Sequence, residues 1–172
     1  MADPAQSFLL SLLVHDRPGV LQRVCMLLAK RGFNIASISV GGSEQTGFSR
    51  MTIRTYGDRK VMQQMVQQLS KLIDVITVQP VEQPFERELV LLKLAAGAGP
   101  GQEGPEYSAT AIAGQVSTFG GKIVQLEAGA CLVEMSGGTA EVEQFIEAIG
   151  RYPIVNMVRT GVAALSLRTE GL

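Results

Sequence analysis

Residues 15–35 read HDRPGVLQRVCMLLAKRGFNI, and this stretch decides which fold the chain can adopt. A short apolar run before it, Phe8–Val14, is typical of a strand inside a sheet. Pro18 fits the first turn of a helix, and Gly32 fits the left-handed residue that ends one. Between them, apolar residues recur at the spacing of a helix with one buried face: Val20, Leu21, Val24, Leu27 and Leu28.

The pattern after Gly32 predicts the rest of one small domain. Residues 35–40 and 48–56 alternate as two strands of a hairpin. Asp58 can cap a second helix, and residues 75–78 form a last strand. The apolar face of that helix contains Val61, Met62, Met65, Val66 and Leu69, which we expect in the core. The order strand–helix–strand–strand–helix–strand is the ferredoxin-like plan, an antiparallel sheet with both helices on one face.

The same order of elements repeats after residues 81–85. We predict a strand at 88–95, a helix around 109–116, a hairpin of 121–126 with 130–135, and a helix that Thr139 caps and Gly150 ends. A last strand at 153–159 is extended by 161–167, and the glycine-rich residues 96–106 form a flexible connector. The predicted fold is therefore α+β, with two ferredoxin-like (βαββαβ) domains in tandem, at 7–80 and 86–172, joined by the linker 81–85.

Composition excludes several classes of protein. The chain has 172 residues, a formal net charge of -1 and no cluster of Lys and Arg, which argues against nucleic-acid binding. The longest early apolar run is too short to span a bilayer, and the first residues lack the positive start of a signal peptide. We expect Cys25 and Cys131 to be buried, reduced thiols. These features indicate a cytoplasmic protein, or the mature form of an organellar protein whose transit segment is missing.

The chain is poor in catalytic groups. It has one His and no CxxC, HExxH or G-x-S-x-G motif, and the glycine-rich loop carries no phosphate-binding lysine. No cofactor or metal site is expected on this chain. The composition therefore favours binding over catalysis.

The junction at Pro18-Gly19 is the best candidate site. Free N–H groups of Gly19 and Val20 at a helix start favour a carboxylate, and Asp16 can pair with an ammonium group, so an α-amino acid suits both. The alternative is that Asp16 merely caps the helix. His15 is expected to be a loop or surface residue. Asn34 is either a turn residue or a polar group at the rim of the sheet.

This plan and the motif DRPGVL resemble the ACT domain, a module that senses small molecules. Four further stretches narrow the resemblance: RGFNIASISVG (31–41), EQTGFSRMTI (44–53), ERELVLLK (86–93) and RTGVAAL (159–165). Together they resemble the small regulatory subunits of acetolactate synthase (acetohydroxyacid synthase), over nearly the whole chain. Many bacterial members carry Asn and Ser where this sequence has Asp16 and Pro18.

The resemblance implies a non-catalytic regulatory subunit in isoleucine, leucine and valine biosynthesis. Such subunits form homodimers through their ACT domains and bind valine or another branched-chain amino acid between two of them. The positions used there correspond to Asp16, Gly19 and Val20 of one chain with Asn34 and Ile35 of the other. The partner is the large catalytic subunit, which holds thiamine diphosphate, Mg2+ and FAD and makes acetolactate from pyruvate, and which the small subunit activates.

Two alternatives stay open at this point. The chain could be a free-standing ACT-type sensor of amino acids that regulates another enzyme or a transcription factor. It could also be a small enzyme that works at the corner of His15 and Asp16. The stretches ERELVLLK and RTGVAAL favour the synthase subunit over the sensor, and absence of turnover by the purified chain would exclude the enzyme.

Overall fold

The computed structural model describes residues 6–95, 108–127 and 129–166. The chain divides into two compact units, and each is described by itself. The N-terminal unit contains residues up to Phe85 together with the segment from Gly161 onward, and the C-terminal unit spans Glu86–Thr160. The predicted glycine-rich connector lies outside the described residues.

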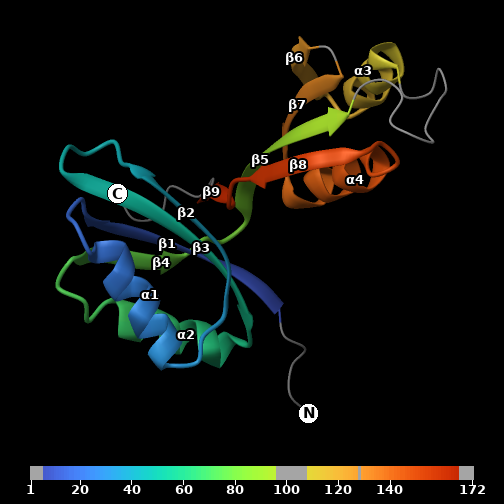
Figure 1. The fold of residues 1–172 in the computed structure, drawn as a ribbon. Helices are drawn as coiled ribbons and strands as arrows, with labels where there is room; N and C mark the ends of the chain where they lie inside the picture. The colour runs from blue at the N-terminus through green and yellow to red at the C-terminus, as the bar shows by residue number, and fades with distance from the viewer. Residues whose placement is uncertain (1–5, 96–107, 128, 167–172) are drawn as a thin grey trace. The chain divides into compact units, whose positions relative to one another are not determined.

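The N-terminal unit has the predicted order of elements (Figure 1). Its four strands form an antiparallel sheet in the order β2-β3-β1-β4, so β1 lies inside and β2 is at an edge. The hairpin of β2 and β3 and the capped second helix are confirmed. The elements are β1 (Gln6–His15), α1 (Val20–Lys30), β2 (Ile35–Gly42), β3 (Phe48–Gly57), α2 (Arg59–Leu69) and β4 (Val75–Pro80).

Alternation along the strands explains why both helices lie on one face of this sheet. Leu10, Leu12 and Val14 alternate along β1 and are fully buried in the core with α1 and α2. Met65 and Leu69 supply the buried stripe of α2, so the predicted apolar face of that helix is core. On the other face of the sheet, Leu9 packs against Val162 and Ala164.

Local signals place the helix ends in this unit. Asp58 caps α2 by accepting a hydrogen bond from the Val61 N–H at 2.7 Å, as predicted. Gly32 has the predicted left-handed conformation, with φ of 72°. Helix α1 differs from the prediction, because its N-cap is Gly19 with φ of 83°, and Pro18 precedes the helix instead of lying in its first turn.

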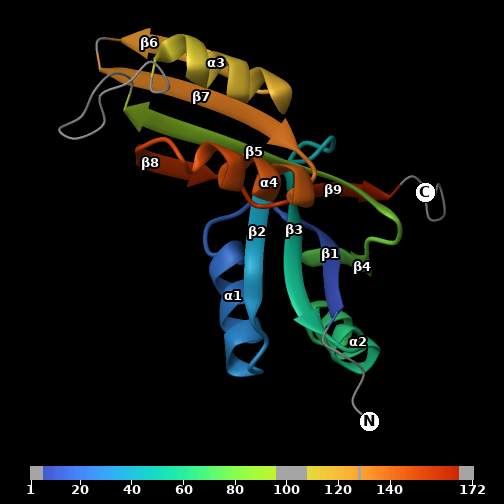
Figure 2. The same ribbon diagram turned by 90° about the vertical axis from the view of Figure 1, so that its right-hand side faces the viewer.

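The C-terminal unit repeats the plan (Figure 2). Its sheet has the order β6-β7-β5-β8, and the short strand β9 also pairs with β5. Helices α3 and α4 cover one face, where Phe145 and Ile112 are fully buried with Leu92. The elements are β5 (Pro84–Ala95), α3 (Ala109–Thr118), β6 (Lys122–Glu127), β7 (Ala130–Gly137), α4 (Thr139–Ile149) and β8 (Ile154–Arg159). The remaining strand, β9 (Ala163–Ser166), belongs to the N-terminal unit.

Several expectations for the second half need correction. Strand β5 begins at Pro84, inside the predicted linker. The last strand is not one extended element, because β8 ends at Arg159 and β9 is separate. Residues from Gly161 onward cluster with the N-terminal unit and not with the predicted second domain. The reason is packing: Val162 and Ala164 are buried against Leu9.

Thr139 does not cap α4. The N-cap is Gly138, whose N–H donates to Oε2 of Glu141 at 2.7 Å. The hydroxyl of Thr139 lies instead 2.6 Å from Oε1 of Glu88. Gly150 does end the helix, as predicted.

Candidate functional site

The predicted site lies where β1 ends and α1 begins. The N–H of His15 donates to the carbonyl of Asp74 at 2.9 Å, and the N–H of Asp16 donates to the carbonyl of Gly47 at 2.9 Å. The ring of His15 stacks on that of Phe48, with centroids 5.0 Å apart. Three segments that are distant in sequence therefore hold the β1–α1 corner in place: β1, the β2–β3 turn and the turn before β4.

The start of α1 has no side-chain cap. Within the described residues, the exposed carboxylate of Asp16 has no hydrogen-bond or ion-pair partner, so the interpretation of Asp16 as a cap is wrong. The N–H of the buried Val20 donates to the Arg17 carbonyl at 3.3 Å, so the prediction that this amide is free is wrong. The next amides, of Leu21 and Gln22, have no acceptor in the described chain. The corner thus offers an uncompensated carboxylate beside a helix start that favours anions.

A residue that sequence reasoning missed completes this corner. Arg23 places Nε 2.9 Å and Nη2 2.7 Å from Oδ2 of Asp74, whose side chain is only 11% exposed. A Cβ added at Gly19 would lie 3.2 Å from Nη1 of Arg23. Side chains of a helix lean toward its N-terminus, so a residue four positions after Gly19 can reach back to it. This spacing was the signal in the sequence that could have pointed to Arg23.

The structure does not bring Asn34 and Ile35 to the corner within one chain. Ile35 pairs with Thr55, which pairs with Phe8 near the start of β1. The corner follows the end of β1, about 24 Å away at 3.4 Å per residue. Asn34 is exposed, and its carbonyl accepts a hydrogen bond from the Thr55 hydroxyl at 2.6 Å. Asn34 therefore lies at the opposite end of the sheet from Asp16.

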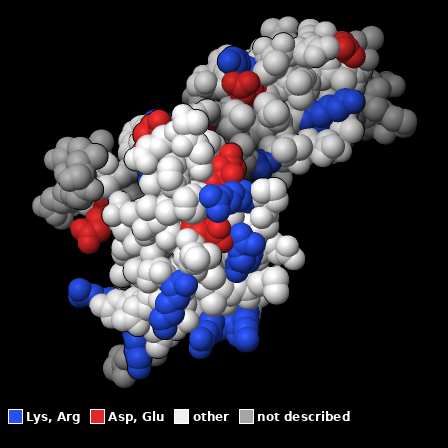
Figure 3. Space-filling view, turned by 90° about the vertical axis from the view of Figure 1, so that its left-hand side faces the viewer, with Lys and Arg blue, Asp and Glu red and all other residues white. Residues whose placement is uncertain are grey.

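Charge differs between the two units. In the N-terminal unit Lys and Arg outnumber Asp and Glu, and the face in Figure 3 shows these basic groups spread over it. In the C-terminal unit Asp and Glu outnumber Lys and Arg. The net positive charge of the N-terminal unit favours the approach of a ligand that carries a carboxylate.

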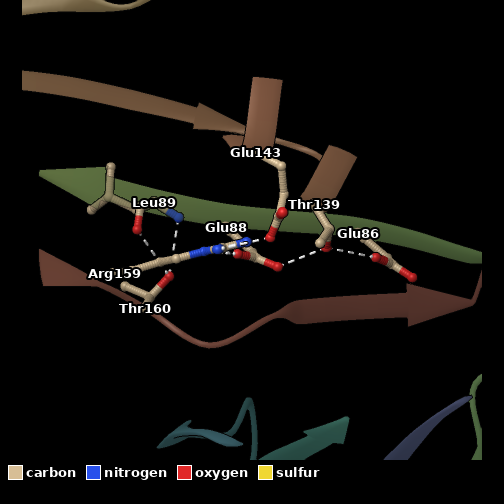
Figure 4. A network of polar contacts seen from close by, with 7 residues as sticks. All are labelled: Glu86, Glu88, Leu89, Thr139, Glu143, Arg159 and Thr160. Carbon is tan, nitrogen blue, oxygen red and sulfur yellow. Dashed lines mark hydrogen bonds and ion pairs between the residues drawn. The ribbon is translucent and has the colours of Figure 1, made fainter. Parts of the chain in front are cut away.

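The C-terminal unit has a polar network of another kind (Figure 4). Nε of Arg159 lies 2.6 Å from Oε2 of Glu88, whose side chain is 4% exposed, and Nη1 lies 3.0 Å from Oε1 of Glu143. Partial burial lowers the pKa of Arg159, but the bonds to Glu88 and Glu143 outweigh it and raise the pKa above its ordinary value. The N–H of Leu89 donates to the Thr160 hydroxyl at 3.0 Å. This network joins the stretch ERELVLLK on β5 to Arg159 and Thr160, the first two residues of RTGVAAL, at the end of β8.

Other kinds of site find little support. Among the residues with described positions, no group of three or more His, Cys, Asp and Glu could hold a metal ion, and no helix is long and apolar enough to cross a membrane. An open pocket lies on the C-terminal sheet, not at the corner; its lining residues are Lys93, Gln125, Glu127, Ala130 and Leu132. Cys131 is buried as expected, whereas Cys25 is only half-buried.

Comparison with known proteins agrees with both halves of the chain. Residues 10–77 match the AHAS small subunit-like ACT domain, and residues 87–168 match the small subunit of acetolactate synthase. A probable acetolactate synthase small subunit of Methanothermobacter thermautotrophicus is 39% identical over 92% of this chain and 91% of its own length. The acetolactate synthase small subunit of Mycobacterium leprae is 34% identical over 95% of this chain and 93% of its own.

A solved structure supports the same assignment. The acetolactate synthase small subunit from Thermotoga maritima superposes with a TM-score of 0.83 at 34% identity, and the match covers 95% of this chain and 99% of that one. The tandem arrangement of two ferredoxin-like units, the first an ACT domain, is thereby confirmed. On the fold, the two motif-bearing sheets and these relatives, the chain belongs to the acetolactate synthase small-subunit family.

Proposed function

We propose that this chain is the regulatory subunit of an acetolactate synthase, and that it senses valine or another branched-chain amino acid at the β1–α1 corner. It binds and activates the large catalytic subunit, and the bound amino acid brings feedback inhibition. In this proposal thiamine diphosphate, Mg2+ and FAD belong to the large subunit, and this chain supplies no catalytic group.

The observation that carries the proposal is the uncompensated corner. Asp16 is an exposed carboxylate without a partner in the described chain, suited to an ammonium group. The uncapped start of α1 is suited to a carboxylate. An α-amino acid has both groups on one carbon, so it can satisfy both at once.

A second copy of the chain completes the pocket. Among the described strands, the edge strand β2 pairs only with β3, and in this proposal its outer edge pairs with β2 of a partner. Full antiparallel overlap of two such strands places Ile35 opposite Gly42 of the partner subunit. Gly42 pairs with Ser49, which pairs with Val14, two residues before Asp16. In such a dimer Asn34 and Ile35 of one chain, which lie far from the corner of their own chain, lie near the β1–α1 corner of the other chain.

The coupling to the large subunit follows from linkage. An amino acid that binds across the β2–β2 edge favours one arrangement of the dimer. It inhibits the synthase if that arrangement activates the large subunit less well. The test is titration calorimetry of the full-length protein with valine, leucine and isoleucine, followed by assays of the large subunit with and without this chain.

Variants make the titration specific. Asp16→Ala and Asn34→Ala should each weaken valine binding by 10-fold or more, roughly the loss of one charge-assisted hydrogen bond. Matched controls are Glu147→Ala and Gln64→Ala, which remove exposed polar side chains without described contacts and should bind valine normally. Equal valine affinity in all four variants would refute the pocket. Valine binding without any effect on the large subunit would favour a free-standing sensor instead.

A further inference from the structure

We infer that Arg23, held in place by Asp74, recognises the carboxylate of the effector and so restricts the pocket to free amino acids. The inference rests on the proposed function and adds a specificity-determining residue to it. Neither the sequence patterns nor the stretches that identify the family pointed to Arg23.

The geometry of the pair leaves one donor group free. Nε and Nη2 of Arg23 both lie within 2.9 Å of Oδ2 of Asp74. Nη1 has no acceptor among the described residues, and it lies against Gly19 at the N-cap of α1. The free end of the guanidinium therefore faces the corner where the carboxylate is proposed to bind.

Asp74 is a rigid support for this arginine. Its side chain is 11% exposed, and its carbonyl accepts the His15 N–H at 2.9 Å, which ties it to the last residue of β1. A planar guanidinium fixed at one edge presents its remaining N–H groups in a defined direction. Because Asp74 offsets the charge of Arg23, the pair contributes directed donors more than net positive charge.

Gly19 is required for this approach. Any side chain at this position would begin 3.2 Å from Nη1, and a φ of 83° already disfavours residues other than glycine. Because Gly19 has no side chain, one ligand group can reach both the start of α1 and the guanidinium of Arg23. A carboxylate could accept from both, whereas a carboxamide carries no charge and gains less from these donors.

The test compares L-valine with L-valinamide, which keeps the ammonium group and the side chain but lacks the carboxylate charge. By calorimetry the full-length protein should bind valine roughly 10- to 100-fold more tightly than valinamide, as expected for a charge-assisted hydrogen bond. Arg23→Gln should lower valine affinity by a similar factor and change valinamide affinity less than about 3-fold. Asp74→Asn keeps the N–H donors of Arg23 but weakens the contact that holds its guanidinium in place, so valine affinity should fall by an intermediate factor. Arg31→Gln, an exposed arginine at the end of the same helix, is the matched control.

The outcomes separate the possible failures. If wild type binds no branched-chain amino acid, the proposed function is refuted. If wild type binds valine and Arg23→Gln keeps the same preference for valine over valinamide, the inference fails while the proposed function stands. If Arg23→Gln weakens both ligands equally, Arg23 has a structural role only, and the inference is again refuted.

Discussion

In both units the last strand of the sheet pairs with the first through a register shift, between Leu13 and Val14 in one and between Lys93 and Leu94 in the other. The second strands also shift near their starts in both sheets. The two units therefore repeat one architecture down to its irregularities, although their residues differ. Because the backbone is shared, differences in side chains at matching places show what each unit is used for.

One matching place lies at the paired first and last strands. The C-terminal unit has the ion pair of Glu88 and Arg159 there, and the register places Phe8 and Pro80 at the same points of the N-terminal unit. The fold itself therefore does not require the ion pair. In the C-terminal unit the polar groups of the network pair with one another, so the network has a structural role. In the N-terminal unit the corner around Asp16 is left unsatisfied, which suits a ligand.

The largest expected effect is at the satisfied network. Arg159→Met should lower the free energy of unfolding by about 3 kcal/mol, because it leaves the carboxylate of Glu88 buried without its cation; the 29% exposure of Arg159 keeps the loss at the lower end of the usual range. Urea unfolding followed by circular dichroism measures it. The double variant Glu88→Leu/Arg159→Met should recover most of the loss, since the matching place in the other unit is apolar.

A surface pair supplies the control. Lys122→Met removes the partner of Glu134 in a contact of 3.1 Å whose side chains are 69% and 30% exposed, and it should cost less than about 1 kcal/mol. If Arg159→Met is no more destabilising than Lys122→Met, the network of Figure 4 is not a stabilising feature.

The next effect is on association. Val40 on β2 and Ile76 on β4 lie on opposite edges of the N-terminal sheet, and they are 46% and 47% exposed. Val40→Lys should weaken the dimer roughly 10- to 100-fold in analytical ultracentrifugation, because it places a charge in the proposed β2–β2 contact. Ile76→Lys should leave the dimer intact. The reverse result would move the twofold to β4 and separate Asn34 from the corner.

A smaller effect compares two helix starts. Gly19 and Gly138 are the N-caps of α1 and α4, with φ of 83° and -64°. Gly19→Ala should destabilise the protein by about 1 to 2 kcal/mol more than Gly138→Ala, since only the first forces an L-residue into a left-handed conformation. Thermal denaturation of the two variants measures the difference. Equal melting temperatures would show that the corner tolerates a side chain.

The smallest effect concerns the two thiols. Burial raises the pKa of the Cys131 thiol, so its neutral form is favoured in the folded protein. Its contribution to stability is therefore present below the ordinary thiol pKa and is lost as pH rises toward the folded value. A thiol reagent at pH 8 should modify the half-buried Cys25 faster than Cys131, and denaturant should remove the difference. Faster labelling of Cys131 would contradict its burial.

Sequence reasoning succeeded where the signal is local. The apolar periodicity of α1, the cap at Asp58 and the helix end at Gly32 depend on neighbours within a few residues, and they are confirmed except at Leu21, which is 43% exposed. Thr139 satisfies the same local rule for a cap as Asp58, but Glu88, 51 positions away, takes its hydroxyl. Local patterns cannot reveal such a competitor.

The candidate site shows the same difference between local signals and long-range contacts. Asp16 and Gly19 were visible because the junction lies within one stretch of sequence. The spacing of Arg23 from Gly19 was a local signal, but Arg23 was missed because Asp74, the partner that holds it, is 51 positions away. Strand β9 was misplaced for a similar reason: a Cβ at Gly161 would lie 2.8 Å from the carbonyl oxygen of Ile38, a contact that no local pattern announces.

Mixing two defective chains tests most directly whether each effector pocket is built from two copies. Asp16→Ala and Asn34→Ala homodimers should both bind valine roughly 10-fold or more weakly than wild type. After mixing and subunit exchange, each mixed dimer has one pocket with both changes and one with neither, so about one quarter of all pockets should recover wild-type affinity. No recovery, in a mixture shown by native mass spectrometry to contain mixed dimers, would mean that the pocket lies within one chain.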